Sequence, residues 1–243
     1  VASIAHEHGL PLLVDSTFTT PWLMKPFEHG ADLIFHSATK FLSGHGTVIG
    51  GVLVDSGAFD WAASGRFPEL SAPYGGFHGM VFSDESTVGA FLLRARREGL
   101  RDFGACMSPH TAWLILQGIE TLPLRMERHC ANALAVAQHL RSHPRVGWVN
   151  YPGLDDHPQH ALVQRQMRSI GGRPGASGLL SFGVQGGLTA GVKFIESAQF
   201  MSHLANIGDT RTLMIHPAST THQQLAAEEQ LASGVTPGLV RLA

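Results

Sequence analysis

The sequence predicts an α/β protein, with a mainly parallel sheet flanked by helices and a smaller α/β domain towards the C-terminus. Short apolar runs, at residues 12–14 and 33–35, alternate with helical segments, as in strand–helix units of a parallel sheet. Each run is followed by polar side chains at its carboxyl end, which is where open α/β sheets bind ligands. These two observations direct the search for a site to that edge.

The first half of the chain is predicted in order from its apolar spacing and its glycines. Gly9 suits the position after a helix and Gly30 closes a second, short helix. Apolar, often β-branched runs predict strands, at residues 12–14, 33–35 and 47–54. Apolar residues at helical spacing predict helices, at residues 1–9, 24–29, 87–102 and 107–118. The segment 56–79, rich in Gly, Pro, Phe and Trp, is expected to be an irregular excursion.

The second half begins with a long predicted helix at residues 124–143, with Leu134, Ala137 and Leu140 on one face. Further elements follow as strands and helices in turn, at residues 146–151, 160–167, 178–184, 191–201 and 239–242. We therefore expect one domain at residues 1–122, a linking helix at 123–145 and a smaller domain at 146–243.

Composition excludes several classes of function. The chain has 243 residues, of which 44% are hydrophobic and 15% charged, with a formal net charge of −2. There is no dense Lys/Arg stripe of the kind that binds nucleic acid. Apolar runs are too short for a membrane span, and the first residues do not form a signal-peptide pattern. A soluble cytoplasmic protein is expected.

Cysteine and histidine patterns do not indicate a metal site. Cys106 and Cys130 have neither metal-pair spacing nor a disulfide framework. The fifteen histidines are numerous, but His143, His157 and His160 lack the spacing of a helical zinc site. No metal is therefore expected.

Lys40 is the chemical centre of the predicted site. Ser37 and Thr39 offer hydroxyls that can bind phosphate oxygens, and Lys40 offers an amine that is nucleophilic if its pKa is lowered. Asp15 ends the preceding strand at the same edge. Alternative interpretations exist for each residue, since a lysine after a strand is more often a solvated charge and Asp15 could cap a helix. Together, lysine, carboxylate and hydroxyls form the set that pyridoxal 5′-phosphate needs.

Many segments, in order along the chain, resemble one enzyme family, the Cys/Met-metabolism (trans-sulfuration) pyridoxal-phosphate-dependent enzymes, and within it the O-acetylhomoserine sulfhydrylase branch. The resemblance is carried by Val14-Asp-Ser-Thr-Phe18, His36-Ser-Ala-Thr-Lys-Phe41, Gly44-His-Gly-Thr47, Gly50-Gly-Val-Leu-Val-Asp55, Leu116-Gln-Gly-Ile-Glu-Thr-Leu-Pro-Leu-Arg-Met-Glu-Arg-His129, Trp148-Val-Asn-Tyr-Pro-Gly153, Leu204-Ala-Asn-Ile-Gly-Asp209, Ile215-His-Pro-Ala-Ser-Thr-Thr-His222 and Gly238-Leu-Val-Arg-Leu242.

This resemblance implies a fold and a set of site residues. The fold would be the type I, aspartate-aminotransferase-like fold of pyridoxal-phosphate enzymes. Residues 1–122 would be the C-terminal part of its large domain, because family members have a substantial portion before this point and continue beyond residue 243. Lys40 would anchor the cofactor and be catalytic. Asp15, Ser37 and Thr39 would bind the cofactor, whereas Arg241 and Asn206 would bind substrate.

The activity that the resemblance implies is γ-replacement. O-acetylhomoserine would react with sulfide or methanethiol to give homocysteine or methionine plus acetate, in a homotetramer whose subunits share sites. A γ-lyase or a cystathionine γ-synthase of the same family is the alternative activity. An inactive fragment that acts only as a folded interaction module is the alternative of another class. A nucleotide-binding domain is disfavoured, because no glycine-rich phosphate motif follows a strand.

Overall fold

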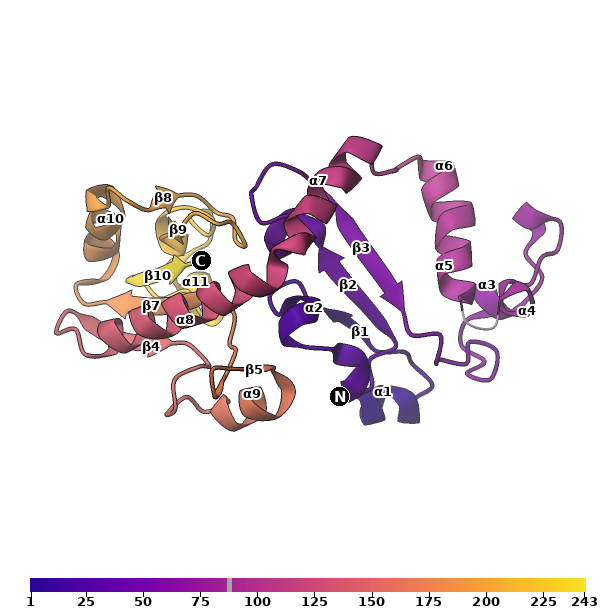
Figure 1. Ribbon diagram of the computed structural model, residues 1–243, viewed down its shortest axis with the longest axis horizontal. Coiled ribbons are helices and arrows are strands. Elements are labelled where there is room, and N and C mark those ends of the chain that lie inside the picture. The colour runs from indigo at the N-terminus through magenta and orange to yellow at the C-terminus, as the bar shows by residue number, and fades with distance from the viewer. Residues whose placement is uncertain (87–88) are drawn as a thin grey trace. The chain divides into compact units, whose positions relative to one another are not determined.

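The computed structural model of the chain describes residues 1–86 and 89–243 (Figure 1). It divides into two compact units that alternate along the sequence. Unit 1 consists of Val1–Thr17, Lys25–Ala38 and Gly50–Trp113, and unit 2 of Phe18–Met24, Thr39–Ile49 and Leu114–Ala243. The domain boundaries given above stay a prediction.

Unit 1 contains a three-stranded sheet in the order β1-β2-β3 (Figure 1). β1 (Leu13–Asp15) pairs in parallel with β2 (Leu33–Ser37), and β2 pairs antiparallel with β3 (Gly51–Asp55). The sheet is therefore mixed, and β3 is not the buried strand expected, since none of its residues is buried. Because β1 and β2 are parallel, Asp15 and Ser37 both end strands at the same sheet edge.

Short helices and an aromatic core make up the rest of unit 1. The segment expected to be irregular contains two helical turns, and its Trp61 stacks on Phe91 with ring centroids 5.6 Å apart. The helix predicted at residues 87–102 starts on residues outside the described ranges, and three consecutive helical segments follow. The unit 1 helices are α1 (Ala2–Glu7), η1 (Pro26–His29), α3 (Pro68–Ser71), η3 (Gly75–Phe77), α4 (Phe82–Glu85), α5 (Ala90–Arg94), η4 (Ala95–Leu100) and α6 (Arg101–Phe103).

Unit 2 contains a five-stranded sheet in the order β4-β7-β10-β9-β8. Its pairs are antiparallel except for β8 with β9. The strands are β4 (Val146–Asn150), β7 (Leu180–Val184), β8 (Ser202–His203), β9 (Leu213–Ile215) and β10 (Leu239–Leu242). A two-stranded ribbon, β5 (Ser169–Ile170) with β6 (Arg173–Pro174), lies outside this sheet.

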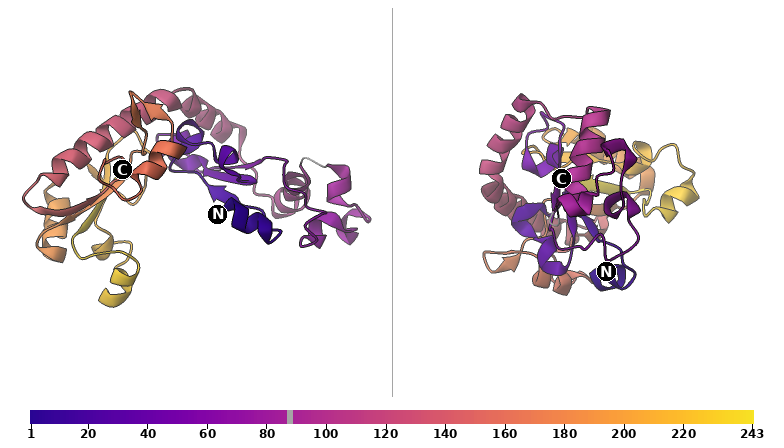
Figure 2. Two further views of the ribbon diagram at one scale, coloured as in Figure 1. Left: turned by 90° about the horizontal axis from the view of Figure 1, so that it is seen from below. Right: turned by 90° about the vertical axis from the view of Figure 1, so that its right-hand side faces the viewer.

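One face of this sheet packs against α8 (Leu122–Arg141) and α10 (Gly187–Ser197), which contribute to the same apolar core (Figure 2). Val240 and Leu242 of β10 are buried in that core. Since successive side chains of a strand point to opposite faces, Arg241 lies on the other face. That face borders a hollow of about 630 Å³, which Arg241 and its strand partner Ser181 both line.

Most strongly periodic elements agree with the sequence predictions. α8, α7 (Pro109–Glu120), α9 (His160–Gln166) and β4 lie within three residues of their expected bounds. Short elements were not predicted, such as α2 (Thr20–Leu23), η5 (Pro217–Ser219) and α11 (Ala227–Ala232). Across the described residues, no helix combines the length and apolarity that crossing a membrane requires.

Candidate active site

Lys40 lies in a tight turn, η2 (Ala38–Leu42), that follows β2. Its backbone angles, φ −92° and ψ −126°, are not helical, although its neighbours are in a π-helical turn. Such a break removes the regular carbonyl partners of a helix, and buried backbone carbonyls need other donors. The surroundings of the turn supply these donors.

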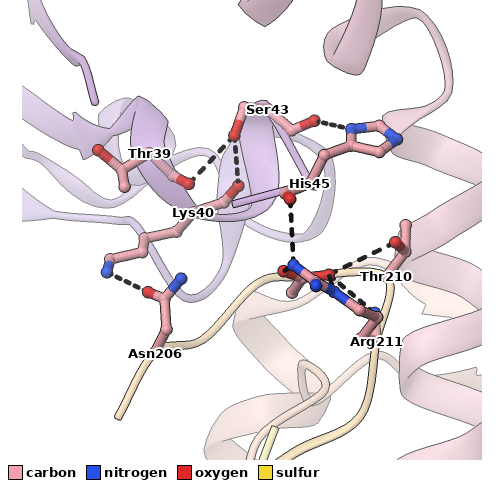
Figure 3. A network of polar contacts seen from close by, with 8 residues as sticks. Thr39, Lys40, Ser43, His45, Asn206, Thr210 and Arg211 are labelled. Atoms are coloured by element: carbon pink, nitrogen blue, oxygen red, sulfur yellow. Dashed lines mark hydrogen bonds and ion pairs between the residues drawn. The ribbon is translucent and has the colours of Figure 1, made fainter. Parts of the chain in front are cut away.

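Every backbone carbonyl from Thr39 to His45 accepts a hydrogen bond within unit 2. Figure 3 shows the bonds to the carbonyls of Thr39, Lys40, Ser43 and His45. Ser43 and Gly44 bond to the Thr39 and Lys40 carbonyls, and His45 bonds to that of Ser43. The remaining donors are far along the chain: the Arg125 guanidinium, the Thr210 amide and the Arg211 guanidinium. Contacts distant in sequence therefore hold the turn.

Two glycines of unit 2 bring backbone directly against this turn. A Cβ on Gly118, in α7, would lie 2.3 Å from the Ser43 carbonyl oxygen, and one on Gly208 would lie 2.4 Å from the Phe41 nitrogen. Gly208 also has a φ of +72°, which favours glycine. Neither position has room for a side chain, so both glycines fix the place of the turn.

The Lys40 amine donates a hydrogen bond to the Asn206 Oδ1, over 2.5 Å (Figure 3). The backbone carbonyl of Asn206 accepts a second hydrogen bond, from the Arg241 Nη2, over 3.1 Å. Asn206 thus connects Lys40 with Arg241, and all three predicted residues lie together in unit 2.

The Arg241 guanidinium retains an unused donor. It is half-buried, and its buried Nε has no hydrogen-bond partner among the described residues. Burial lowers the pKa of Arg241, but arginine stays charged at neutral pH. A buried charged donor without a partner is costly, and a carboxylate would satisfy it with a charge-assisted bond.

Asp209 and Arg211 form an ion pair beside the turn. The Arg211 Nε and Nη2 bond to the two carboxylate oxygens of Asp209 over 3.1 and 2.8 Å. Burial alone would raise the pKa of Asp209, but the bonds from Arg211 outweigh it and lower that pKa. The pair therefore remains charged and holds Arg211 near the His45 carbonyl.

In unit 1, Thr17 links Asp15 to Ser37. The Thr17 amide and hydroxyl donate to the Asp15 Oδ1 over 2.9 and 2.6 Å, and the hydroxyl accepts the Ser37 amide over 2.8 Å. Thr17 is buried, whereas Asp15 is exposed. Nearby, burial lowers the pKa of His36, whose Nδ1 lies 3.1 Å from the Ser16 carbonyl oxygen. His36 is therefore neutral at neutral pH.

The predicted residues thus form two groups, Lys40, Asn206 and Arg241 in unit 2, and Asp15 with Ser37 in unit 1. Thr39 is beside Lys40, and its carbonyl accepts from Ser43. Sequence reasoning missed the residues that hold these groups in place. A glycine inside an apolar helix was the one available signal, since Gly118 costs helix stability and so indicates close packing. In the described ranges, no three His, Cys, Asp or Glu side chains gather as a metal site.

Comparison with known sequences identifies the family. The profile of the Cys/Met metabolism PLP-dependent enzymes matches residues 1–243. The chain belongs to this family. The resemblance found in its motifs, the type I fold and the pyridoxal-phosphate dependence of the family are thereby confirmed.

Two relatives within the family match this chain along its full length. The chain is 49% identical to O-acetyl-L-homoserine sulfhydrylase of Leptospira meyeri, over 100% of this chain and 55% of the relative. It is 48% identical to homocysteine synthase of Schizosaccharomyces pombe, over 100% and 56%. The chain therefore spans about half the length of the curated relatives it matches.

A solved structure of similar fold comes from Campylobacter jejuni. It is described as an O-acetylhomoserine (thiol)-lyase, and it superposes with a TM-score of 0.92 at 37% identity, over 100% of this chain and 56% of that one. That protein carries a pyridoxyl-lysine monophosphate residue. A lysine-linked cofactor thus occurs on this fold.

Proposed function

We propose that this chain is part of an enzyme that catalyses γ-replacement on O-acetylhomoserine. Sulfide or methanethiol would replace acetate, giving homocysteine or methionine. The observation that carries the proposal is the match of the entire chain, at 48–49% identity, to a sulfhydrylase and a homocysteine synthase. The lysine–asparagine–arginine chain of contacts in unit 2 supports it independently.

The residues fit pyridoxal 5′-phosphate. Lys40 would carry the cofactor through its amine, Asp15 would keep the pyridine nitrogen protonated, and the hydroxyls of Ser37 and Thr39 would bind the phosphate. The exposed carboxylate of Asp15 supports its role, because Thr17 occupies Oδ1 and orients the group. When bound, the cofactor supplies an electron sink for breaking the Cα–H bond of an amino acid.

Arg241 and Asn206 would bind the substrate α-carboxylate. Arg241 presents the unpaired, buried Nε described above, and its planar guanidinium suits a carboxylate. Asn206 would support this role in two ways, by accepting from Arg241 Nη2 through its carbonyl and by adding its side-chain amide to the carboxylate site. The substrate would then lie near the Lys40 amine.

Lys40 would act as the acid and base of the reaction. Its amine would remove one proton from the substrate Cα and one from Cβ, so that acetate can leave Cγ, and would return both protons after sulfide has added at Cγ. The hydrogen bond to Asn206 Oδ1 supports this role, since it orients Nζ before substrate arrives. On the basis of the family, we also propose that the enzyme is a homotetramer whose subunits share sites, and that it is located in the cytoplasm.

The first experiment locates the cofactor. Borohydride converts a reversible link between lysine and pyridoxal into a stable one, which peptide mass mapping then detects. In the purified full-length protein, we expect a pyridoxyl adduct on Lys40 and none on Lys25 or Lys193. The variant Lys40→Arg should lose the adduct. An unmodified Lys40 in folded wild-type protein would contradict the assignment.

The second experiment identifies the reaction. Wild-type protein is incubated with O-acetylhomoserine and either sulfide or cysteine, and the products are separated. We expect acetate and homocysteine with sulfide. Cystathionine as the main product with cysteine would instead indicate a cystathionine synthase, and release of a keto acid without any added nucleophile would indicate a γ-lyase.

A further inference from the structure

The geometry points to Arg125 as a positioning residue for Lys40: its guanidinium fixes the turn that carries the lysine by binding the two carbonyls that follow it. This inference rests on the proposed function of Lys40. Arg125 lies in α8, 85 residues along the chain from Lys40, and no sequence pattern distinguishes it from a solvated arginine on a helix.

The guanidinium of Arg125 donates hydrogen bonds through all three of its nitrogens. Nη1 donates to the Phe41 carbonyl over 2.8 Å, and Nη2 donates to those of Gly118 and Leu42 over 2.6 and 3.4 Å. Nε donates to the Thr121 hydroxyl over 3.1 Å. One planar group therefore joins the end of α7, the start of α8 and the Lys40 turn, a geometry that a lysine cannot reproduce.

The space around Arg125 is shaped for this contact. A Cβ on Gly44 would lie 2.5 Å from the Arg125 Nη1, so the turn can approach the guanidinium only because residue 44 is glycine. The two carbonyls that it binds in the turn belong to Phe41 and Leu42, which are both buried. Without Arg125 these carbonyls would lose their donors, and the backbone of the turn would shift to find water.

A shift of the turn would move the Lys40 amine away from Asn206. Misplacing a reacting group by about 1 Å can lower a rate by about 10²-fold. A positioning role therefore predicts a loss of kcat and a changed environment of the amine, with little change in KM, because Arg125 does not line the hollow next to Arg241.

The test compares Arg125→Lys and Arg125→Gln with Arg128→Ala in full-length, cofactor-loaded protein. Arg128 is an exposed arginine one turn further along the same helix, so it is the matched control. Three readouts are used: kcat and KM, the rate at which borohydride fixes cofactor on Lys40, and the pH at which the visible absorbance of the bound cofactor changes.

We expect both Arg125 variants to remain folded, to lose kcat by roughly 10- to 100-fold, and to shift the pH of the absorbance change, whereas Arg128→Ala behaves as wild type. Arg125 variants that match Arg128→Ala would overturn the inference. So would an Arg125→Lys protein that is unfolded by circular dichroism, since the role would then be stability of the whole fold. An unmodified Lys40 in wild type would refute the proposed function instead.

Discussion

Lys40 and Asp15 are held in contrasting ways. Four of the seven carbonyls from Thr39 to His45 bond to residues that are 83 to 166 positions away in the sequence, including Arg125 and Arg211. The Asp15 carboxylate is held by Thr17, two residues further along the chain. The position of Lys40 thus depends on distant segments of unit 2. The position of Asp15 needs only the end of its own strand and the turn that follows it.

This contrast predicts where substitutions will act. Changes far from Lys40 in sequence should reach it through the turn, and the same kind of change should leave Asp15 unaffected. Substitutions that disturb Asp15 should lie within a few residues of it. Four substitutions, from the largest expected effect to the smallest, test this difference.

Gly118→Ala should have the largest effect on stability. The new Cβ would meet the Ser43 and Leu42 carbonyl oxygens at 2.3 and 2.5 Å, so backbone must move. Overpacking of this kind costs about 3 kcal/mol of unfolding free energy, measured by urea denaturation. Gly99→Ala is the control, because its Cβ would meet nothing within 4 Å. Equal stability of the two variants would contradict the close packing.

Asp15→Asn should change activity without changing the fold. The asparagine Oδ1 still accepts both bonds from Thr17, but the charge is lost. Removing one electrostatic group from a site typically lowers the rate by about 10²-fold, and the substrate assay would show this with an unchanged urea midpoint. The control is Asp60→Asn, at another surface carboxylate that accepts a hydrogen bond from a backbone amide. This variant should leave the rate and the urea midpoint unchanged. If Asp15→Asn lowers the urea midpoint, the role of Asp15 is to stabilise the fold.

Thr17→Val removes the hydroxyl that links Asp15 to Ser37. The Ser37 amide then loses its acceptor, which costs about 1–2 kcal/mol. Thr17→Ser keeps the hydroxyl and serves as the control. Denaturation curves of the two variants should separate, with valine below serine. If they coincide, Thr17 does not organise this strand end.

The ion pair of Asp209 and Arg211 should give a small, pH-dependent effect. The pKa of Asp209 is lower in the folded protein than its ordinary value of 3.8. Its stabilising contribution is therefore complete above that value and is lost as pH falls towards the folded pKa. The stability gap between wild type and Asp209→Asn should narrow below about pH 4. Asp156→Asn, in an exposed pair with Arg141, should show almost no gap at any pH.

The sequence predicted side chains at strand ends better than it predicted their supports. Lys40 and Asp15 follow apolar runs, and that pattern is local, so it can be found without a structure. Arg125 lies in the first turn of α8, between Leu124 and Met126, and nothing in that local pattern indicates which backbone carbonyls its guanidinium binds. The carbonyls that Arg125 binds could not be predicted from the sequence. Their positions depend on the non-helical backbone at Lys40, where residues from three segments of the chain meet.

Strand pairing was also beyond sequence reasoning. β3 was expected to be buried, but it pairs antiparallel with β2 and none of its residues is buried. β8 and β9 have two and three residues, which is too short for periodicity to detect. The long helix α8 was predicted well, since its apolar spacing extends over five turns.

The amide of Asn206 gives the site a further property. An amide group carries an acceptor and a donor on one rigid plane, and a half rotation about its Cβ–Cγ bond exchanges them. Asn206 Oδ1 accepts the hydrogen bond from the Lys40 amine. If the proposed substrate carboxylate binds beside Arg241, a half rotation of the Asn206 amide would exchange its donor and its acceptor, so that binding of the carboxylate and loss of the Lys40 hydrogen bond would be coupled through one side chain.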